Sequence, residues 1–202
     1  MANVIKLRKG LDVNLKGKAA KEEFQVKKPA VYALVPDDFT GMKPKVVVKE
    51  NDVVKVGDSL FVDKNHPEIK FVSPVSGRVT MVERGDRRKV LSVRVEADAE
   101  QQYVDFGKKN VGQMTAQEVK DLLLESGLFG FFRQRPYDVT ANPSDTPKAI
   151  FVSAFNSMPL AADFEYVLRG READFQAGLD ALAKMAKTYL LSLIHISEPT
   201  RP

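Results

Sequence analysis

The sequence contains no cysteine and only two histidines, His66 and His195. The absence of cysteine excludes disulfide bonds, thiolate metal ligands and a cysteine nucleophile. No Gly-x-Gly-x-x-Gly run is present, so the usual dinucleotide-binding fingerprint is missing as well. We find no metal-ligand cluster and no nucleophile–base set in the sequence. The sequence therefore predicts no catalytic residue and no metal site in this chain.

Long apolar runs and a one-sided charge are also missing. No window approaches the 18 uncharged apolar residues of a transmembrane helix, and the start, Met1 to Gly10, lacks the apolar run of a signal peptide. The 31 basic and 27 acidic residues are interspersed, and the net charge is only +4. Aromatic residues do not interleave with the basic ones, which disfavours nucleic-acid binding. We expect a cytoplasmic chain, or one held at a membrane through partners.

Residues 1–105 are predicted to form a β-domain. Hydrophobic residues make up 44% of the chain, which is enough for a packed core. A faint repeat links 53–58 with 80–86: each is a strand followed by a Gly-Asp turn, in which glycine can take a positive φ. The duplication predicts two interlocked halves of a β-sandwich. Short β-branched runs predict strands at 45–48, 59–62, 69–72, 78–82 and 90–95.

Residues 106–191 show helical spacing and predict the beginning of an α/β domain. Thr115 and Glu118 form a capping box before an apolar face, and Gly127 is placed to end that helix. A buried strand is expected at 149–153 and a long helix at 171–191. Residues 192–202 resemble translated vector read-through, so we leave them out of the fold and expect the natural protein to continue beyond Leu191. The alternative is a natural strand and tail.

The stretch 53–79 carries the spacing of a cofactor-bearing hairpin. A Gly-Asp turn is followed by a strand, a hairpin and Ser73-Pro-Val-Ser-Gly77. This pattern resembles lipoyl and biotinyl domains, a barrel-sandwich hybrid fold. In that family the modified lysine lies at the hairpin tip, eight positions before the proline, where this sequence has His66. The resemblance implies a structural hairpin without a carried cofactor. His66 could be a metal ligand or an ordinary histidine of a solvated loop.

A second resemblance covers Leu122 to Pro136 and the strand that follows it. The segment is similar to the flavin loop of the NADH-oxidising, FMN-binding subunit of respiratory complex I, where a glycine run approaches the flavin phosphate. Here the run continues after Gly130 as Phe131-Phe132-Arg133-Gln134-Arg135, and the acidic residues expected near Asn156 are absent. The resemblance implies a related domain without its flavin site. Arg133 and Arg135 are candidates to bind a phosphate directly, or else to face solvent or a partner.

The combination of segments resembles the A-subunit family of sodium-translocating NADH:quinone oxidoreductases. The segments that carry the resemblance are Ile5–Asp12, Ser126–Phe129, Arg133–Tyr137 and Ile150–Asn156. The family implies a peripheral subunit, free of cofactors, on the cytoplasmic face of the bacterial inner membrane. The complex would oxidise NADH, reduce ubiquinone or menaquinone and pump sodium ions. FMN, riboflavin, FAD and iron–sulfur centres would lie in partner subunits.

Two alternatives remain open at this stage. The chain could be a standalone lipoyl- or biotin-type carrier, or a barrel-sandwich interaction module. The contacts of such a module, or of a quinone, are expected at His66, Arg133 and Arg135. The basic turn 84–89 either docks an acidic partner or lipid head groups, or is an ordinary solvated loop.

Overall fold

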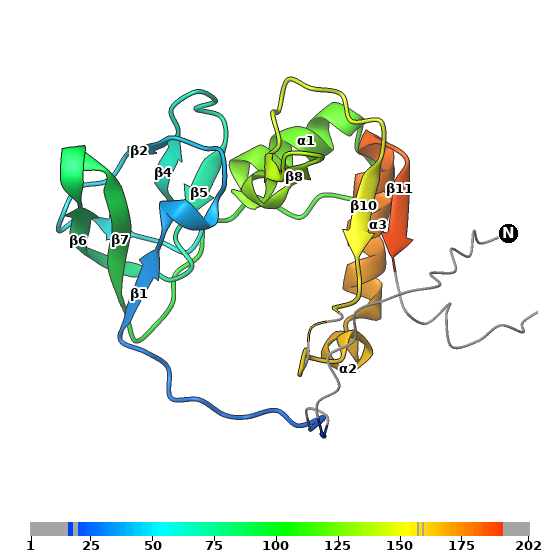
Figure 1. The fold of residues 1–202 in the computed structure, drawn as a ribbon, viewed down its shortest axis with the longest axis horizontal. Coiled ribbons are helices and arrows are strands. Elements are labelled where there is room, and N and C mark those ends of the chain that lie inside the picture. The colour runs from blue at the N-terminus through cyan, green and yellow to red at the C-terminus, as the bar shows by residue number, and fades with distance from the viewer. Residues whose placement is uncertain (1–15, 18–19, 157, 159, 192–202) are drawn as a thin grey trace, which may run out of the picture. The chain divides into compact units, whose positions relative to one another are not determined.

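The computed structural model describes residues 16–17, 20–156, 158 and 160–191 (Figure 1). The chain divides into two compact units. The first to be described consists of residues 27–146 and contains the β-domain. The second combines residues 1–26 with residues 147–202, within the limits of the described ranges.

Two antiparallel sheets form the β-domain, as the sequence predicts (Figure 1). The larger sheet takes strands from both units of the repeat, because Val53 of the first unit lies opposite Arg78 on the strand that carries the second. The larger sheet has the order β1 (Val31–Leu34), β7 (Val90–Ala97), β6 (Gly77–Arg84) and β3 (Val53–Val54). The smaller has the order β2 (Pro44–Val46), β4 (Ser59–Asp63) and β5 (Lys70–Val72).

The core lies between these sheets and is rich in aromatic rings. Phe61 and Phe71 stack with their ring centroids 5.0 Å apart, and Phe39 lies 4.4 Å from Phe71. Burying a side chain of this size stabilises the fold by roughly 1.5–3 kcal/mol. The largest side chains that are almost fully buried are Phe61, Phe71, Leu60, Ile69, Val79, Val93 and Val95.

The Pro-x-x-Gly motif has a packing reason in this fold. Gly77 begins β6, and a Cβ atom at this position would overlap the carbonyl oxygen of Glu96 on β7. Ser73, also in the motif, is buried and donates from its hydroxyl to the carbonyl oxygen of Val75 over 2.6 Å. The motif therefore allows the strands to approach closely, independently of any attached cofactor.

The two repeated turns differ in conformation. Gly57 has φ +99°, as expected for the first Gly-Asp turn. Gly85 has φ −95°, so the expectation of a positive φ there is wrong. The 3-10 turn η2 (Asp86–Arg88) places the positive φ on Arg87 (+53°) and Arg88 (+62°) instead. The sequence repeat is thus not a repeat of backbone geometry.

The first helix matches its prediction closely. After the short turn η3 (Val111–Gln113), α1 runs over Ala116–Glu125, and both hydrogen bonds of the capping box between Thr115 and Glu118 are present. These bonds also hold the pKa of the Glu118 carboxyl below its ordinary value. Gly127 takes φ +76° and ends the helix, because residues with a Cβ atom rarely adopt this conformation.

Residues beyond α1 continue on the β-domain. The 3-10 helix η4 (Leu128–Phe131) is followed by a small hairpin of β8 (Arg133–Gln134) and β9 (Val139–Thr140). The backbone N–H of Thr140 donates to the carbonyl oxygen of Thr40 over 2.8 Å. The compact unit thus extends to residue 146, and the predicted domain boundary at residue 105 stays a prediction.

The other unit is a strand–helix–strand arrangement. The strand β10 (Ile150–Ser153) is followed by α2 (Phe164–Leu168), α3 (Glu172–Met185) and β11 (Thr188–Leu191). β10 and β11 pair in parallel, with Phe151 opposite Tyr189. Asp163 accepts a hydrogen bond from the N–H of Tyr166 at the start of α2 and lies 2.6 Å from Lys21. Both contacts lower the pKa of its carboxyl, the Lys21 contact most strongly.

The predicted helix over 171–191 is wrong in its last part. α3 ends at Met185, and Leu190, which the prediction included in the helix, belongs to β11. Thr188 and Tyr189 favour a strand, and pairing with β10 satisfies their backbone groups. An α/β pattern is nevertheless confirmed. None of the helices in the described ranges has the length and apolar character needed to cross a membrane.

The two Gly-Asp turns give a matched test of this geometry. We expect Gly57→Ala to lower the free energy of unfolding by about 1–2 kcal/mol, because alanine is strained at positive φ. Val104 and Phe106 also crowd the site of the new Cβ, at 3.2 Å. Gly85→Ala is the control, since its φ is ordinary and the atom that its new Cβ would meet, at 3.1 Å, is the end of the partly exposed Leu91 side chain, which can move aside. Urea denaturation measures both, and equal losses would contradict this account.

Candidate functional site

The hairpin between β4 and β5 holds the first candidate position. Asp63, at the end of β4, is buried, and its carboxylate accepts hydrogen bonds from the N–H groups of Lys43 and Asn65, each over 3.1 Å. The N–H of Ile69 donates to the carbonyl oxygen of His66 over 2.9 Å and closes the tip. The structure therefore places His66 at the tip of an ordered turn, in the position that the lipoyl resemblance assigns to a modified lysine.

His66 has no set of metal ligands around it. Its side chain is 32% exposed, and its Nδ1 atom lies 3.7 Å from a carboxylate oxygen of Glu68. Within the described ranges, no three His, Asp or Glu side chains are grouped so that they could hold a metal ion. A lipoyl or biotinyl group needs an amine at the tip, and imidazole cannot form that amide. The residues at this tip therefore do not fit the cofactor of the fold family.

The second candidate position, η4, packs directly on the β-domain. A Cβ atom on Gly130 would lie 2.7 Å from Cε1 of Phe71, and one on Gly127 would lie 2.6 Å from Cγ1 of Val72. The ring of Phe131 meets the ring of Phe39 edge to face at 5.7 Å. Because Phe71 is only 2% exposed, its ring has no space into which it can move. The two glycines thus allow the backbone to approach the sheet closely at β5.

The aromatic residues of this segment have different environments. Phe131 is 68% exposed, whereas Phe129 is 5% exposed and stacks on Phe132 at 5.4 Å. Phe129, which the sequence interpretation passed over, is therefore the ring that the segment buries. The signal that could have found it is the three-residue spacing to Phe132, because residues i and i+3 share one face of a 3-10 helix.

Arg133 is held by backbone carbonyl oxygens on both arms of its guanidinium. One arm donates to the oxygen of Asp38 over 2.9 Å, and the other donates to the oxygen of Asp138 over 3.2 Å. Arg135 is different, since its side chain is 77% exposed and its one ion pair, to Asp138, spans 3.6 Å. The sequence suggested Arg133 and Arg135 as joint ligands of a phosphate, but their side chains make different contacts in the structure. Arg133 links β8 to η1 (Pro36–Asp38), while Arg135 faces solvent.

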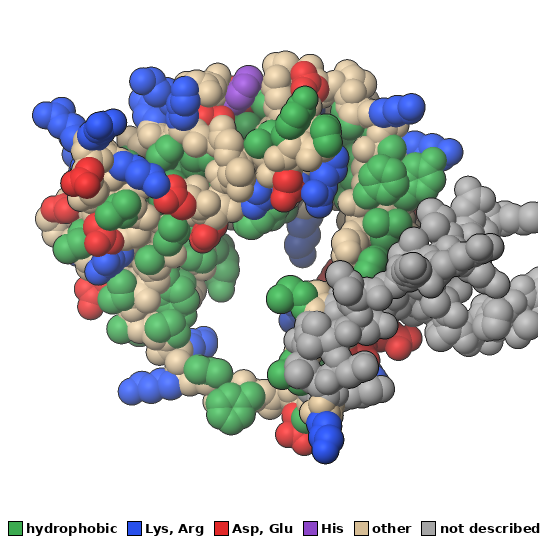
Figure 2. Space-filling view, viewed as in Figure 1, with side chains coloured by type: hydrophobic (Ala, Val, Ile, Leu, Met, Phe, Trp, Pro, Cys, Tyr) green, Lys and Arg blue, Asp and Glu red, His purple; other side chains and the backbone are tan. Residues whose placement is uncertain are grey.

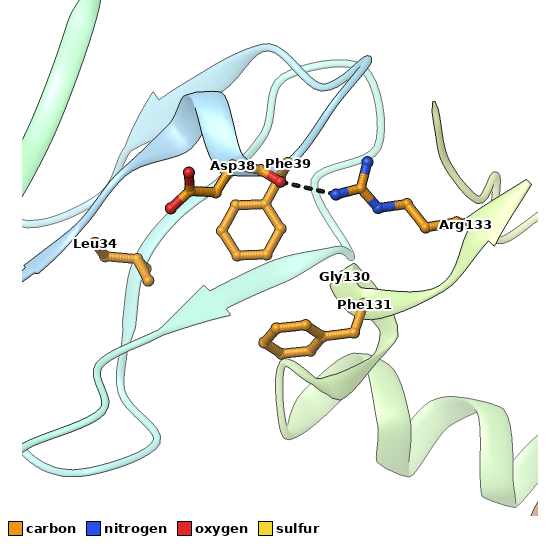
Figure 3. Close-up of a pocket in the computed structure, with 6 residues that line it drawn as sticks. All are labelled: Leu34, Asp38, Phe39, Gly130, Phe131 and Arg133. Atoms are coloured by element: carbon orange, nitrogen blue, oxygen red, sulfur yellow. Dashed lines mark hydrogen bonds between the residues drawn. The ribbon is translucent and has the colours of Figure 1, made fainter. Parts of the chain in front are cut away.

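An open hollow of about 390 Å³ lies where η1 and η4 meet (Figure 3). Figure 3 shows the rings of Phe39 and Phe131 facing it, with the Arg133 bond to Asp38 along one side. The lining offers apolar surface, one carboxylate and one guanidinium, with no nucleophile next to a base. The hollow is lined by Leu34, Asp38, Phe39, Gly130, Phe131 and Arg133.

Comparison with known families gives two matches along the chain. Residues 5–98 match the NqrA N-terminal barrel-sandwich hybrid domain, and residues 114–199 match the NqrA second alpha/beta domain. These matches confirm the predicted fold class, a barrel-sandwich hybrid followed by an α/β domain. The second match extends beyond Leu191, and residues 192–202 lie outside the described ranges, so the predicted read-through tail stays a prediction.

Individual relatives agree with the family matches. The chain is 34% identical over 199 residues to the Na(+)-translocating NADH-quinone reductase A-subunit of Pseudomonas aeruginosa UCBPP-PA14, covering 97% of this chain and 44% of the relative. It is 36% identical to the protein of the same name from Yersinia pseudotuberculosis IP 31758 and 37% identical to that from Serratia proteamaculans. Each of these two alignments covers 90% of this chain and 41% of the relative.

The chain thus spans less than half the length of the curated relatives that it matches. Both of its predicted domains find a family counterpart in the same order, and the aligned region includes the hairpin tip and the η4 segment. On the two domain matches and the identity over nearly its whole length, the chain belongs to the NqrA family.

Proposed function

We propose that the chain works as a subunit of a bacterial Na(+)-translocating NADH-quinone reductase. The main support for this proposal is the similarity, over 97% of the chain, to proteins named as the A-subunit of that enzyme. In the proposed complex, NADH is oxidised, ubiquinone or menaquinone is reduced and sodium ions are exported. This chain sits at the cytoplasmic face of the membrane, and FMN, riboflavin, FAD and iron–sulfur centres are bound by partner subunits.

Its contribution is to dock and hold partners, without a cofactor of its own. Two observations support this part of the proposal. A histidine, His66, stands at the hairpin tip where a carrier domain needs a lysine. The glycines of η4, Gly127 and Gly130, are in contact with Val72 and Phe71, so the loop backbone is not free to enclose a phosphate. A carrier role would need Lys64 or Lys70 to accept the cofactor, although neither lies at the tip.

The exposed candidates at these two positions suit contact with partners or a quinone. His66 is partly exposed at its tip, Arg135 extends into solvent, and the hollow beside Arg133 is lined by aromatic rings. Aromatic and arginine side chains are the residue types that most often anchor an interface. We assign no individual quinone atom to any of them, since the geometry favours contact without specifying a ligand.

Assembly tests the proposal directly. The protein is tagged in its natural reading frame and co-expressed with the other reductase subunits in a host that lacks its own NqrA protein. We expect the tagged protein to co-purify with those subunits from detergent-solubilised membranes. An unrelated barrel-sandwich domain with the same tag is the control. Recovery of the tagged protein alone, with none of the other subunits, would contradict the proposal.

The absence of a cofactor is tested by absorbance and intact mass. We expect the purified chain to show no flavin band, and its mass to match the sequence after co-expression with biotin and lipoyl ligases. The imidazole of His66 cannot accept either group, and η4 lacks room for a flavin phosphate. A known biotin-accepting domain in the same cells is the positive control. Stoichiometric flavin, or an added mass on Lys64 or Lys70, would sink the cofactor-free role.

A matched pair of arginine variants separates a packing role from phosphate binding. We expect Arg133→Ala to lower the free energy of unfolding by about 0.5–1 kcal/mol, because two carbonyl oxygens lose a charged donor and water replaces it only in part at this exposed site. Arg135→Ala should change it by less than about 0.5 kcal/mol, since its ion pair is exposed. Thermal and urea unfolding measure both. Equal, negligible effects would show that Arg133 does not brace the fold.

A further inference from the structure

The turn between β6 and β7 is the most basic exposed feature of the β-domain. We call residues 84–89, Arg-Gly-Asp-Arg-Arg-Lys, the arginine turn. Figure 2 shows Lys and Arg side chains gathered at this end of the hairpin, at the upper left of the view. Four of its six residues carry a positive charge and are exposed, and Asp86 carries the only negative charge. The turn therefore presents a local positive field to solvent.

The backbone of the arginine turn is strained. The N–H of Lys89 donates to the carbonyl oxygen of Asp86 over 3.1 Å, so Arg87 and Arg88 are the two central residues of a tight turn. Both have positive φ, +53° and +62°. Hairpins that need this conformation favour Asn-Gly, because left-handed backbone is costly for residues with a larger side chain. The sequence thus has two arginines where a more stable pair was available.

Neither strained arginine stabilises the chain through its side chain. Lys89 forms an ion pair with Asp37 over 2.6 Å, and Arg84 donates to the carbonyl oxygen of Arg88 over 3.5 Å. Within the described residues, the guanidinium groups of Arg87 and Arg88 make no hydrogen bond or ion pair. The turn is therefore braced by Arg84 and Lys89, and it carries two unpaired guanidinium groups on successive residues. Exposed strain of this kind points to a function outside the chain itself.

We propose that the arginine turn is a docking surface for a carboxylate-rich segment of a protein partner, with Arg87 and Arg88 as its contacts. The partner is one of the other reductase subunits, so this identity rests on the proposed function. A guanidinium pairs with a carboxylate through two parallel hydrogen bonds, and the tight turn places Arg87 and Arg88 on successive residues at the exposed end of the hairpin. Two adjacent carboxylates, from aspartate or glutamate, complement the turn.

A membrane surface fits the arginine turn less well. Lipid-binding patches usually cluster four to eight Lys or Arg residues, each contributing through a diffuse field. Here Lys89 is paired with Asp37 and Arg84 bonds to the backbone of Arg88, which leaves two unpaired groups. Two charges on a fixed backbone suit a specific partner better than a diffuse anionic surface. Lipid binding is therefore the competing outcome of the test.

The strain itself supplies a variant that keeps the fold. Arg87→Asn with Arg88→Gly installs the pair that this turn conformation favours, and it removes both guanidinium groups. We expect the purified chain to gain about 2–4 °C in Tm, because the strain is relieved. We expect its association with the other subunits to weaken by about tenfold, because two charge-assisted contacts are lost. A variant that is more stable and assembles less well cannot be explained by misfolding.

The control removes the same charge elsewhere on the β-domain. Lys45→Gln with Arg78→Gln changes two exposed residues on β2 and β6 that are distant in sequence from the turn. We expect this variant to assemble like the wild type. Assembly is measured as the yield of each co-expressed partner with the tagged protein at low and moderate salt, and the deficit of the turn variant should shrink as salt screens the contact.

Several outcomes would overturn the proposal. If the wild type assembles and the Arg87→Asn/Arg88→Gly variant assembles equally well, the docking surface is rejected. The assignment to the reductase is then unaffected. Equal losses in this variant and in the Lys45→Gln/Arg78→Gln control reject it in favour of a general charge effect. If the Arg87→Asn/Arg88→Gly variant assembles normally but no longer binds phosphatidylserine vesicles, the turn binds lipid and not a protein partner. Failure of the wild type to assemble at all rejects the proposed function, on which the partner's identity rests.

Discussion

The close contact between Phe71 and η4 is the constraint on which the arrangement of residues 27–146 depends. Phe71 stacks on Phe61 within the sandwich and lies against Phe39 beside η1. Its remaining neighbour is the backbone of Gly130, where no Cβ atom fits. One buried ring thus connects the smaller sheet, the η1 turn and the segment after α1. Because the backbone of η4 packs directly against that ring, its position relative to the β-domain is fixed by this contact.

The packing of η4 on Phe71 bears on the proposal that this chain binds no flavin. In a flavin loop, glycines allow N–H groups to approach a phosphate, which requires a concave and solvated backbone. In this chain the same residue type allows η4 to approach Phe71 and Val72. In the proposed cofactor-free role, this segment serves packing on the β-domain and not the binding of a phosphate. Arg133 reinforces the junction by bonding to carbonyl oxygens on either side.

The sequence predicted those elements whose signals are local. The capping box at Thr115, the helix end at Gly127 and the β-strands follow from short patterns, and the structure contains them. The error at Leu190 arises because apolar spacing fits a helix as well as a strand. The deciding partner, Val152 on β10, is far away in the sequence. The burial of Phe129 likewise depends on the 3-10 geometry of η4; the three-residue spacing to Phe132 fits that geometry, but the spacing alone does not show which sheet the pair packs against.

The two Gly-Asp turns show how physical cost separates a structural turn from a functional one. At the first turn a glycine, Gly57, takes the positive φ, and its neighbours pack closely around it. At the second turn the glycine adopts an ordinary φ, and two arginines take the strained conformation. A sequence selected for stability alone would favour Asn-Gly at these positions, as it keeps glycine at the first turn. The strain therefore falls where the chain presents unpaired charge to solvent. The proposed docking surface gives this strain a reason, because a contact with a partner would offset the stability that the two arginines cost the isolated chain.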